Sequence, residues 1–372
     1  MQSRHTIAVH GSYHTDNFGD VLLVSLYSRW IQQHSLNPRV VLPFVPRALR
    51  SLYSVDAFGV GELMRAHGLV YTGGGYFGEP SHGVARWTVR NIMRHAPVGY
   101  CIRARSRPYI INGVGAGPLT MRASRRTFVD LFQRAAAITV RDNESKEFLV
   151  SYGMDPERIL VTADAAFMLS RSDIPRESWE YASQRVSSAE SAAILGVHLA
   201  APTGVKGIQH VLSDLKRFAR GTNSVKYLLL CDSGIGTPRG WQAENAKLLK
   251  AELGAKAVLV PYVSPWHLAA ILGEVDAVVT TKLHVGIVAT ALGSLSLAFP
   301  QHAKTQRLYR QIDAPERCTL LSELEKGVAY RKLNQLIEGR WKGYRLPDHV
   351  LDAAGKNRDA VHRFVDSVTA AR

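Results

Sequence analysis

A lysine and a histidine stand between an expected strand and an expected helix late in the chain. Residues 278–293 read VVTTKLHVGIVATALG, in which a β-branched run precedes Lys282, Leu283 and His284 and small residues follow them. The run is typical of a buried strand, and the small residues favour a closely packed helix. Because a helix N-terminus attracts anions and histidine ordinarily titrates near neutral pH, the pattern predicts an anion site with a proton-transfer group. The alternative is a capping turn with two solvated side chains.

Glycines follow two expected strands in the first half of the chain. They are Gly73, Gly74 and Gly75 in one group, and Gly113, Gly115 and Gly117 in the other. Glycine lets backbone amides approach a ligand closely, so these turns are predicted to contact one. Neither group matches the dinucleotide pattern GxGxxG, and the alternative is that they only let helices pack on a sheet.

Polar residues after the first expected strand form the segment HGSYHTDNFGD, residues 10–20. Asn17 suits the N-cap of the helix that follows. Capping explains Asp20 less well, and an aspartate beside a glycine-rich cleft is a candidate acceptor-binding group or base.

Charged residues end further strands. Arg141 is followed by Asp142, Asp164 opens the segment DAAF, and Lys304 lies twenty residues beyond His284 at the end of the next strand. Arg141 and Asp142 could form a surface ion pair of little energetic value. At a cleft, however, an arginine offers a planar fork for a carboxylate or phosphate.

Strand-like apolar runs alternate with helix-like segments, which predicts an α/β protein with two doubly wound, Rossmann-like domains. The expected strands are 6–9, 39–42, 69–72, 109–112, 137–140 and 158–161, then 193–199, 226–231, 256–260, 276–280 and 294–299. The predicted N-terminal domain is 1–170, with the glycine-rich turns on the acceptor side; a polar linker, 171–192, precedes a second domain, 193–345, and a helical tail, 346–372. Because ligands bind at the carboxyl ends of parallel strands, we expect the site in a cleft that the two domains face.

Composition excludes several classes of protein. The chain is 46% hydrophobic and 21% charged, and no apolar run approaches the roughly 18 residues of a membrane span. The N-terminus lacks a signal-peptide pattern, so we expect a cytoplasmic protein. Three widely separated cysteines suggest neither a disulfide framework nor a CxxC metal site.

The formal charge of +15 predicts attraction to polyanions, anionic lipid or phosphorylated substrates. No nucleic-acid-binding signature accompanies this charge, so nucleic acid is not an expected partner. The patterns HExxH, GxSxG and the P-loop are absent, and the spacing of His10, Asp16, His284 and His302 does not support a metal site.

The ordered set NFGD, YTGGG, GVGAGP, VRDNES, VTADAAF, KLHVGIVATALG and QHAK resembles the polysaccharide pyruvyl transferase family. The resemblance spans roughly residues 8–310. It implies a two-domain fold of the GT-B type and transfer of pyruvate from phosphoenolpyruvate to a sugar of a cell-surface glycan or its lipid-linked precursor, where the pyruvate forms a ketal.

The resemblance also implies roles for particular residues. The family's active-site groups correspond to Lys282, His284, Arg141 and Lys304, with Lys282 standing where arginine is common. Lysine keeps the charge but loses the bidentate fork. The cations would bind the phosphate and carboxylate of the donor, and His284 would serve as acid or base. The scheme requires neither a metal nor a cofactor, since phosphoenolpyruvate is a substrate.

Two other functions remain open at this point. A GT-B-type nucleotide-sugar glycosyltransferase would also need glycine-rich turns and cations, because its donor carries a diphosphate. A noncatalytic glycan- or lipid-binding protein could have kept the fold. Peripheral contact with an anionic membrane is expected from the charge and from the acceptors that the resemblance implies. The acceptor sugar, the ketal stereochemistry and the oligomeric state cannot be deduced from the sequence.

Overall fold

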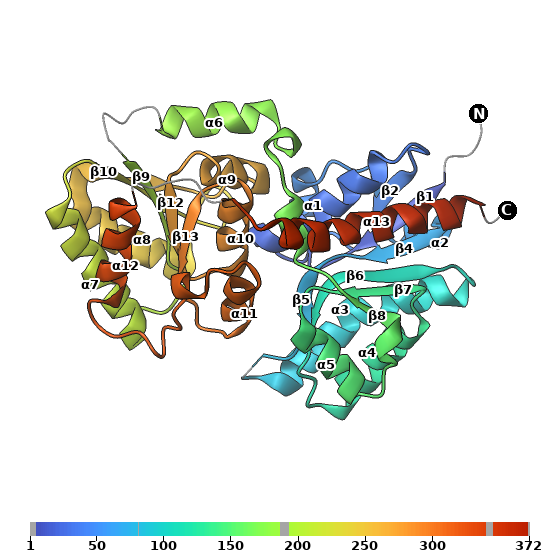
Figure 1. Cartoon of the computed structure of the whole chain (residues 1–372). Helices are drawn as coiled ribbons and strands as arrows, with labels where there is room; N and C mark the ends of the chain where they lie inside the picture. The colour runs from blue at the N-terminus through green and yellow to red at the C-terminus, as the bar shows by residue number, and fades with distance from the viewer. Residues whose placement is uncertain (1–4, 81, 187–192, 340–344, 371–372) are drawn as a thin grey trace. The chain divides into compact units, whose positions relative to one another are not determined.

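The computed structural model describes residues 5–80, 82–186, 193–339 and 345–370 (Figure 1). The chain forms two compact units. Unit 1 comprises Met1–Met168 and Leu351–Arg372, and unit 2 comprises Leu169–Val350. Unit 1 is therefore built from both ends of the chain.

Unit 1 contains a parallel sheet in the order β3-β2-β1-β4-β6-β7-β8, with β5 pairing β6. The strands are β1 (Thr6–His10), β2 (Arg39–Leu42), β3 (Ala57–Phe58), β4 (Gly68–Tyr71), β5 (Gly74–Phe77), β6 (Tyr109–Ala116), β7 (Ala137–Val140) and β8 (Ile159–Val161). The helices are α1 (Phe18–Gln32), α2 (Val60–Arg65), α3 (Val84–Ala104), α4 (Arg122–Arg134), α5 (Asn143–Ser151) and α13 (Asp348–Ala370).

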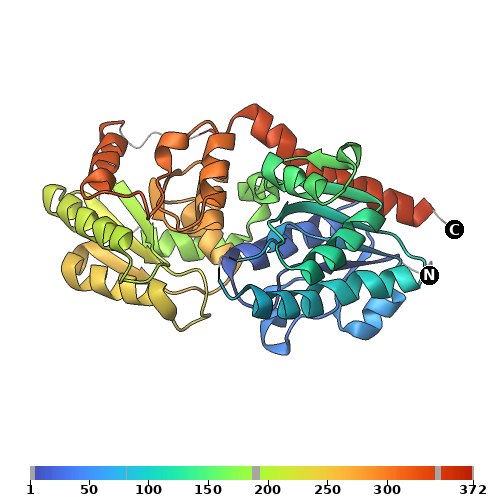
Figure 2. The same ribbon diagram turned by 90° about the horizontal axis from the view of Figure 1, so that it is seen from below.

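Helices cover both faces of this sheet. Helices α2, α3 and α4 pack in succession on one face, while α1 and the C-terminal helix α13 lie on the other (Figures 1 and 2). The ring of His34, just after the end of α1, and the ring of His362 in α13 meet at 5.1 Å between centroids. Because the sheet is covered on both faces, most strands carry continuous apolar runs rather than an alternating pattern.

Asn357 ties α13 to the sheet. Its side chain is fully buried; Oδ1 accepts hydrogen bonds from the hydroxyls of Thr139 (2.8 Å) and Thr162 (3.0 Å), and Nδ2 donates to the carbonyl of Ala163 (2.8 Å). The Asn357 carbonyl accepts from Asn112 at 3.1 Å. One helix side chain thus satisfies buried polar groups on β7 and just beyond β8.

Unit 2 has a five-stranded parallel sheet in the order β11-β10-β9-β12-β13. Its strands are β9 (Ala193–His198), β10 (Val225–Leu230), β11 (Ala257–Val260), β12 (Ala277–Thr280) and β13 (Leu295–Ala298). Its helices are α6 (Arg176–Val186), α7 (Lys206–Gly221), α8 (Gly240–Leu253), α9 (Pro265–Leu272), α10 (Leu283–Ala291), α11 (Lys304–Gln311) and α12 (Val328–Glu338). Helices α7, α8 and α12 share a core with one face of the sheet.

The expected doubly wound architecture is confirmed in both units. The segment 171–192, predicted as a linker, contains helix α6, which packs against α9; its last six residues, 187–192, lie outside the described part of the chain. Residues 340–344 at the end of the predicted second domain also lie outside it. The predicted tail, 346–372, is mostly α13, and from Leu351 onward it belongs to unit 1.

The glycine segments are more regular than the turns that the sequence predicted. Gly74 and Gly75 lie in β5, and Gly115 lies in β6, which continues to Ala116. Gly113 and Gly115 face crowded surroundings, since a Cβ on Gly113 would come within 2.5 Å of the Tyr27 hydroxyl. Because glycine has no side chain, β6 can pass close to the side chains that pack over Gly113 and Gly115.

No helix of the described ranges combines the length and the hydropathy that crossing a membrane requires.

Candidate functional site

The segment containing Lys282 and His284 has the predicted strand, turn and helix. Lys282 is the N-cap residue of α10, Leu283 is its first residue and is buried, and His284 lies in its first turn. The backbone N–H of Lys282 donates to the Thr280 hydroxyl at 2.9 Å, which closes the turn after β12. The lysine and the half-buried histidine therefore lie at the carboxyl end of the sheet, beside a helix N-terminus.

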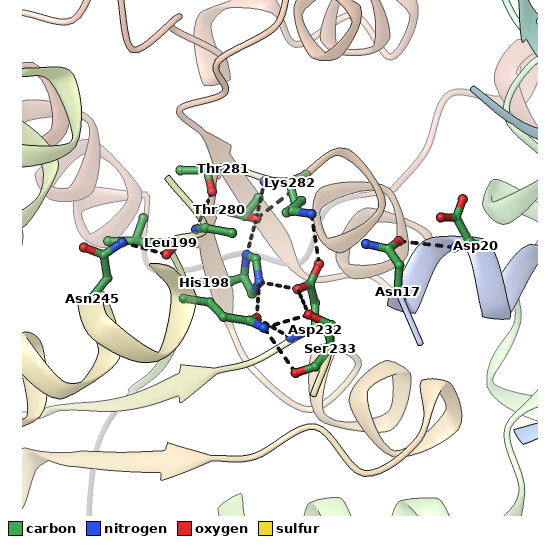
Figure 3. Close-up of polar contacts among 12 residues, drawn as sticks. Asn17, Asp20, His198, Leu199, Asp232, Ser233, Asn245, Thr280, Thr281 and Lys282 are labelled. Atoms are coloured by element: carbon green, nitrogen blue, oxygen red, sulfur yellow. Dashed lines mark hydrogen bonds and ion pairs between the residues drawn. The ribbon is translucent and has the colours of Figure 1, made fainter. Parts of the chain in front are cut away.

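Lys282 is held by a buried aspartate just after strand β10, which is separated from β12 by β9 (Figure 3). Its Nζ lies 3.6 Å from Oδ2 of Asp232, and Oδ1 of the same carboxylate lies 3.4 Å from Nε2 of His198, which ends β9. His198 is fully buried, Asp232 nearly so, and the Lys282 side chain remains 40% exposed. The arrangement leaves the lysine partly in solvent, where it can meet a ligand.

A glutamine from α8 fixes the aspartate. Oε1 of Gln242 accepts a hydrogen bond from the backbone N–H of Asp232 at 2.7 Å and lies 3.3 Å from Nε2 of His198. Burial alone would raise the pKa of Asp232, but the charge and hydrogen bonds of His198 and Lys282 hold it well below its usual range. Asp232 is therefore an ionised carboxylate throughout the physiological pH range.

Two further basic side chains lie at the end of β13. Lys304 is exposed and begins α11, and His302 precedes it. Burial lowers the pKa of His302, and the charges of Lys304 and Lys282 lower it further. The two lysines therefore both lie close enough to His302 to act on its charge, and the ring is mostly neutral. Two cations near a helix N-terminus, with a neutral histidine beside them, are suited to binding an anion with several charged oxygens.

Arg141 and Asp164 form the corresponding charged group in unit 1. The Arg141 guanidinium lies 3.2 Å from Oδ2 of Asp164 through Nη1, and 3.7 Å from Oδ2 of Asp142 through Nε. Both Arg141 and Asp164 are buried, unlike a surface ion pair. A Cβ on Gly115 would come within 2.8 Å of the guanidinium, so this glycine provides the room in which Arg141 lies.

Other predicted residues of unit 1 lie at the start of α1 and in the glycine segment of β5. Asn17 is the N-cap of α1, and its Oδ1 accepts from the backbone N–H of Asp20 at 3.5 Å. Oδ1 of Asp20 would lie 4.0 Å from a Cβ on Gly74, so the aspartate is close to the glycine segment. Gly75 is exposed, and a Cβ there would lie 3.8 Å from Nη2 of Arg141.

Two other predicted glycines have structural neighbours that account for them. A Cβ on Gly117 would come within 2.3 Å of the Phe148 ring, and φ is +73° there. Gly73 is buried, and a Cβ would come within 3.1 Å of the carbonyl of Gly113. Close packing and the positive φ therefore require glycine at position 117, whereas a side chain at position 73 would only be crowded.

The sequence did not single out a buried histidine pair in unit 1. Nε2 of His10, at the end of β1, lies 2.8 Å from Nδ1 of His95 in α3, and Nδ1 of His10 lies 2.6 Å from the Tyr13 hydroxyl. Burial lowers the pKa of His95 to about 3, with contributions from His14 and Arg94, and holds that of His10 well below its usual value. Both rings are therefore neutral and share hydrogen bonds.

The site residues thus fall into two groups. Unit 2 brings together Lys282, His284 and Lys304 with His198 and Asp232, which were not predicted as site residues, and with His302, which was considered only as a metal ligand. Unit 1 brings together Arg141, Asp164, Asp20 and the glycines. His198 and Asp232 directly follow apolar runs. This position at the end of a strand is the sequence feature that could have identified them as site residues. In the described ranges, no three His, Cys, Asp or Glu side chains are grouped as a metal site would require.

Comparison with known proteins shows which family this chain resembles. The model of the family described as polysaccharide pyruvyl transferase matches residues 17–293, about three quarters of the chain. A search of curated proteins finds no match.

Solved structures with the same fold include UDP-GlcNAc 2-epimerases. The enzyme from Methanocaldococcus jannaschii is 8% identical, with 99% of this chain and 100% of that chain covered and a TM-score of 0.67. The enzyme from Neisseria meningitidis, bound to UDP-GlcNAc, is 11% identical, with 98% of each chain covered and a TM-score of 0.62. At such low identity the likeness shows the fold alone, which is of the GT-B type. The family match covers most of the chain, and the chain belongs to the polysaccharide pyruvyl transferase family.

Proposed function

We propose that this protein transfers pyruvate from phosphoenolpyruvate to a sugar of a cell-surface or extracellular polysaccharide, or of its lipid-linked precursor, and forms a pyruvate ketal. The observation that carries the proposal is the cluster of Lys282, His302 and Lys304 beside the N-terminus of α10. Phosphoenolpyruvate has a phosphate and a carboxylate on three carbons, so it needs cations from several directions. Family membership supplies the reaction class, pyruvyl transfer.

The proposed reaction proceeds by addition and elimination. A sugar hydroxyl attacks C2 of the donor while the methylene carbon gains a proton and becomes a methyl group; the proton lost by the hydroxyl balances the one gained by carbon. The C2–O bond to phosphate then breaks and phosphate leaves. Attack by a second hydroxyl, with loss of its proton, closes the ketal. The chemistry therefore needs a proton donor, a base and a stabilised leaving group.

Residues of unit 2 supply these functions in the proposal. Lys282 and Lys304 bind the anionic groups of the donor and stabilise the leaving phosphate, and Leu283 contributes to the donor site. His284 acts as the acid or the base; its place in the first turn of α10, two residues from Lys282, supports this role. Asp232 and His198 do not react but hold Lys282 in place.

Residues of unit 1 serve the same reaction in the proposal. Arg141, held by Asp164, is a catalytic cation, and Asp20 is a base or a group that binds the acceptor. Asn17 and the glycine segments contribute to the acceptor side. No cofactor is needed. The proposed location is the cytoplasm, at the inner face of the membrane where lipid-linked acceptors are assembled.

The experiment that tests the proposal measures phosphate released from phosphoenolpyruvate with and without glycan from cells that lack this gene. We expect release only with the acceptor, and a gain of one pyruvate ketal in the mass of the glycan. UDP-sugars are incubated in parallel, because a nucleotide-sugar glycosyltransferase would consume them instead. Release from neither donor, with the glycan bound but unchanged, would indicate a noncatalytic binding protein.

A further inference from the structure

Positive charge is concentrated in one part of unit 1. Between Glu79 and Asp130 the sequence contains nine arginines, no lysine and no acidic residue. The whole chain has a formal charge of +15, so most of its excess charge lies in this stretch. The stretch includes helices α3 and α4, which pack against each other on the same face of the sheet (Figure 1).

Helix α3 has one face fixed in the core. His95 contacts His10 and stacks on the Tyr76 ring with centroids 4.4 Å apart, and the Asn91 side chain donates to the carbonyl of Tyr76. Asn91 and His95 are both buried and lie one turn apart. These contacts fix the rotation of the helix about its axis and thus determine which side chains point into solvent.

The opposite side of α3 is both apolar and basic. Its exposed residues Arg86, Val89, Arg90, Met93 and Arg94, spaced at one helical turn, are here called the α3 face. Val89 is 66% exposed and Met93 is 70% exposed, which are the highest values among the large hydrophobic residues of the described ranges. Two apolar side chains thus project from among three arginines.

The arginines of the α3 face have no acidic partner among the described residues. Burial lowers the pKa of Arg94, and repulsion from Arg90 lowers it further. On α4, which packs against α3, Arg122, Arg125 and Arg126 are also exposed, and Arg125 lies over the Tyr152 ring. The α3 face therefore combines arginines that have no acidic partner with apolar side chains that are exposed to water. Such a surface is suited to a partner that supplies both anions and an apolar phase.

We infer that the α3 face binds the surface of an anionic phospholipid membrane. Arginine forks would bind lipid phosphates, while Val89 and Met93 would insert at the boundary between headgroups and acyl chains. A duplex nucleic acid would satisfy the charges but not the two apolar side chains. A second copy of this chain would bring like charges together. The inference concerns unit 1 and is independent of the donor chemistry.

The test is cosedimentation of the full-length protein with vesicles of phosphatidylcholine alone and with phosphatidylglycerol added. We expect binding only to the anionic vesicles, and weaker binding at high salt. Arg90→Gln/Arg94→Gln should weaken the binding by roughly 30-fold, since each arginine near an anionic surface contributes about fivefold. Val89→Ser/Met93→Ser should remove the part of the binding that persists at high salt.

Control variants remove the same kinds of side chain at positions outside the α3 face. Lys247→Gln/Arg363→Gln removes two exposed cations, and Leu248→Ser removes a side chain that is 47% exposed on α8. These controls should bind vesicles nearly as well as the wild type, and all variants should unfold at the wild-type temperature because the substituted side chains are exposed. Equal loss in the control double variant, or retained binding in Arg90→Gln/Arg94→Gln, would overturn the inference. So would a wild-type protein that binds a duplex oligonucleotide through these arginines but does not bind the vesicles.

Discussion

At the scale of single residues, His284 is the group on which the proposed chemistry depends most. His284→Gln preserves some hydrogen bonding but cannot transfer a proton. We expect it to lower turnover by roughly 100-fold or more while phosphoenolpyruvate binding changes little. Calorimetric titration and phosphate release measure the two quantities separately. His349→Gln, at an exposed position in the same unit, is the control. Wild-type turnover in His284→Gln would exclude a proton-transfer role.

Asp232 is predicted to stabilise unit 2 through its charge. Its pKa is depressed in the folded state, so its contribution is present above the unfolded value of about 3.9 and is lost as the pH falls toward the folded value. Asp232→Asn should lower the free energy of unfolding by about 1–3 kcal/mol at neutral pH, because Lys282 and His198 lose a charged acceptor. Urea unfolding measures the difference.

The control for this variant is Glu244→Gln, which removes an exposed carboxylate from α8. It should leave the stability of unit 2 within about 0.5 kcal/mol of the wild type. If Asp232→Asn were as stable as the wild type at neutral pH, the ion pairs of Asp232 would make no net contribution to the free energy of unfolding.

Some residues of the candidate site could be predicted from the sequence because the strands of the sheet are parallel. Lys282, His284 and Lys304 follow successive parallel strands, so their approach to one end of the sheet follows from topology. The contribution of Asp232 could not be predicted in this way, because it depends on Gln242, which reaches it from helix α8. Gly115 was predicted to contact a ligand through its backbone amide, and this stays a prediction; that it also makes room for Arg141 is shown only by the packed structure.

At the scale of elements, the contact between β1 and α3 should make unit 1 sensitive to acid. His95 and His10 have depressed pKa values, so above about pH 6.5 both are neutral in the folded and unfolded states. As the pH falls below this value the unfolded chain gains protons that the folded chain does not, and stability is lost. Each such histidine should lower the free energy of unfolding by about 2 kcal/mol between pH 7 and pH 5.

The variant His95→Gln isolates this effect. It can keep a hydrogen bond to His10 but does not titrate, so its loss of stability between pH 7 and pH 5 should be smaller than that of the wild type by about 2 kcal/mol. His82→Gln, at an exposed position in unit 1, should show the wild-type loss. An identical pH dependence in His95→Gln and the wild type would mean that His95 is not kept neutral by the fold.

Asn357 is the corresponding link between α13 and the sheet. Asn357→Ala should destabilise unit 1 by about 3 kcal/mol, because the hydroxyls of Thr139 and Thr162 and the carbonyl of Ala163 lose a buried partner. Ser367→Ala, which removes an exposed hydroxyl from the same helix, is the control and should be nearly neutral. Urea unfolding that is the same for both variants would show that water replaces the lost bonds.

The elements themselves were predictable where the chain repeats a strong local pattern. β-branched and apolar runs marked β1, β2, β7 and β12 to within a residue or two of their observed bounds. The strands β3 and β5 were missed, since one has two residues and the other begins with two glycines. Helix α6 is polar apart from Trp179, Tyr181 and a few small residues, and its packing against α9 cannot be deduced from its own sequence.

At the scale of the whole molecule, the two units differ in how the chain builds them. Unit 2 is continuous, Leu169–Val350, and has its own core of aliphatic and aromatic side chains around five strands. Unit 1 needs a helix that arrives from the far end of the sequence, since Asn112 and Asn357 are separated by 245 positions. Such a contact carries no local signal, and the sequence therefore predicted the segment only as a helical tail.

This difference predicts how fragments of the chain should behave. A fragment of residues 169–350 should fold alone and unfold cooperatively in urea. Residues 1–168 alone should not, because one face of their sheet lacks α13 and the partners of Asn112, Thr139 and Thr162 are missing. Addition of a peptide of residues 346–372 should restore cooperative unfolding, whereas the same peptide with Asn357→Ala should restore less. A fragment 1–168 that unfolds cooperatively by itself, and whose urea midpoint the peptide does not change, would show that α13 is an attached tail and not a structural part of unit 1.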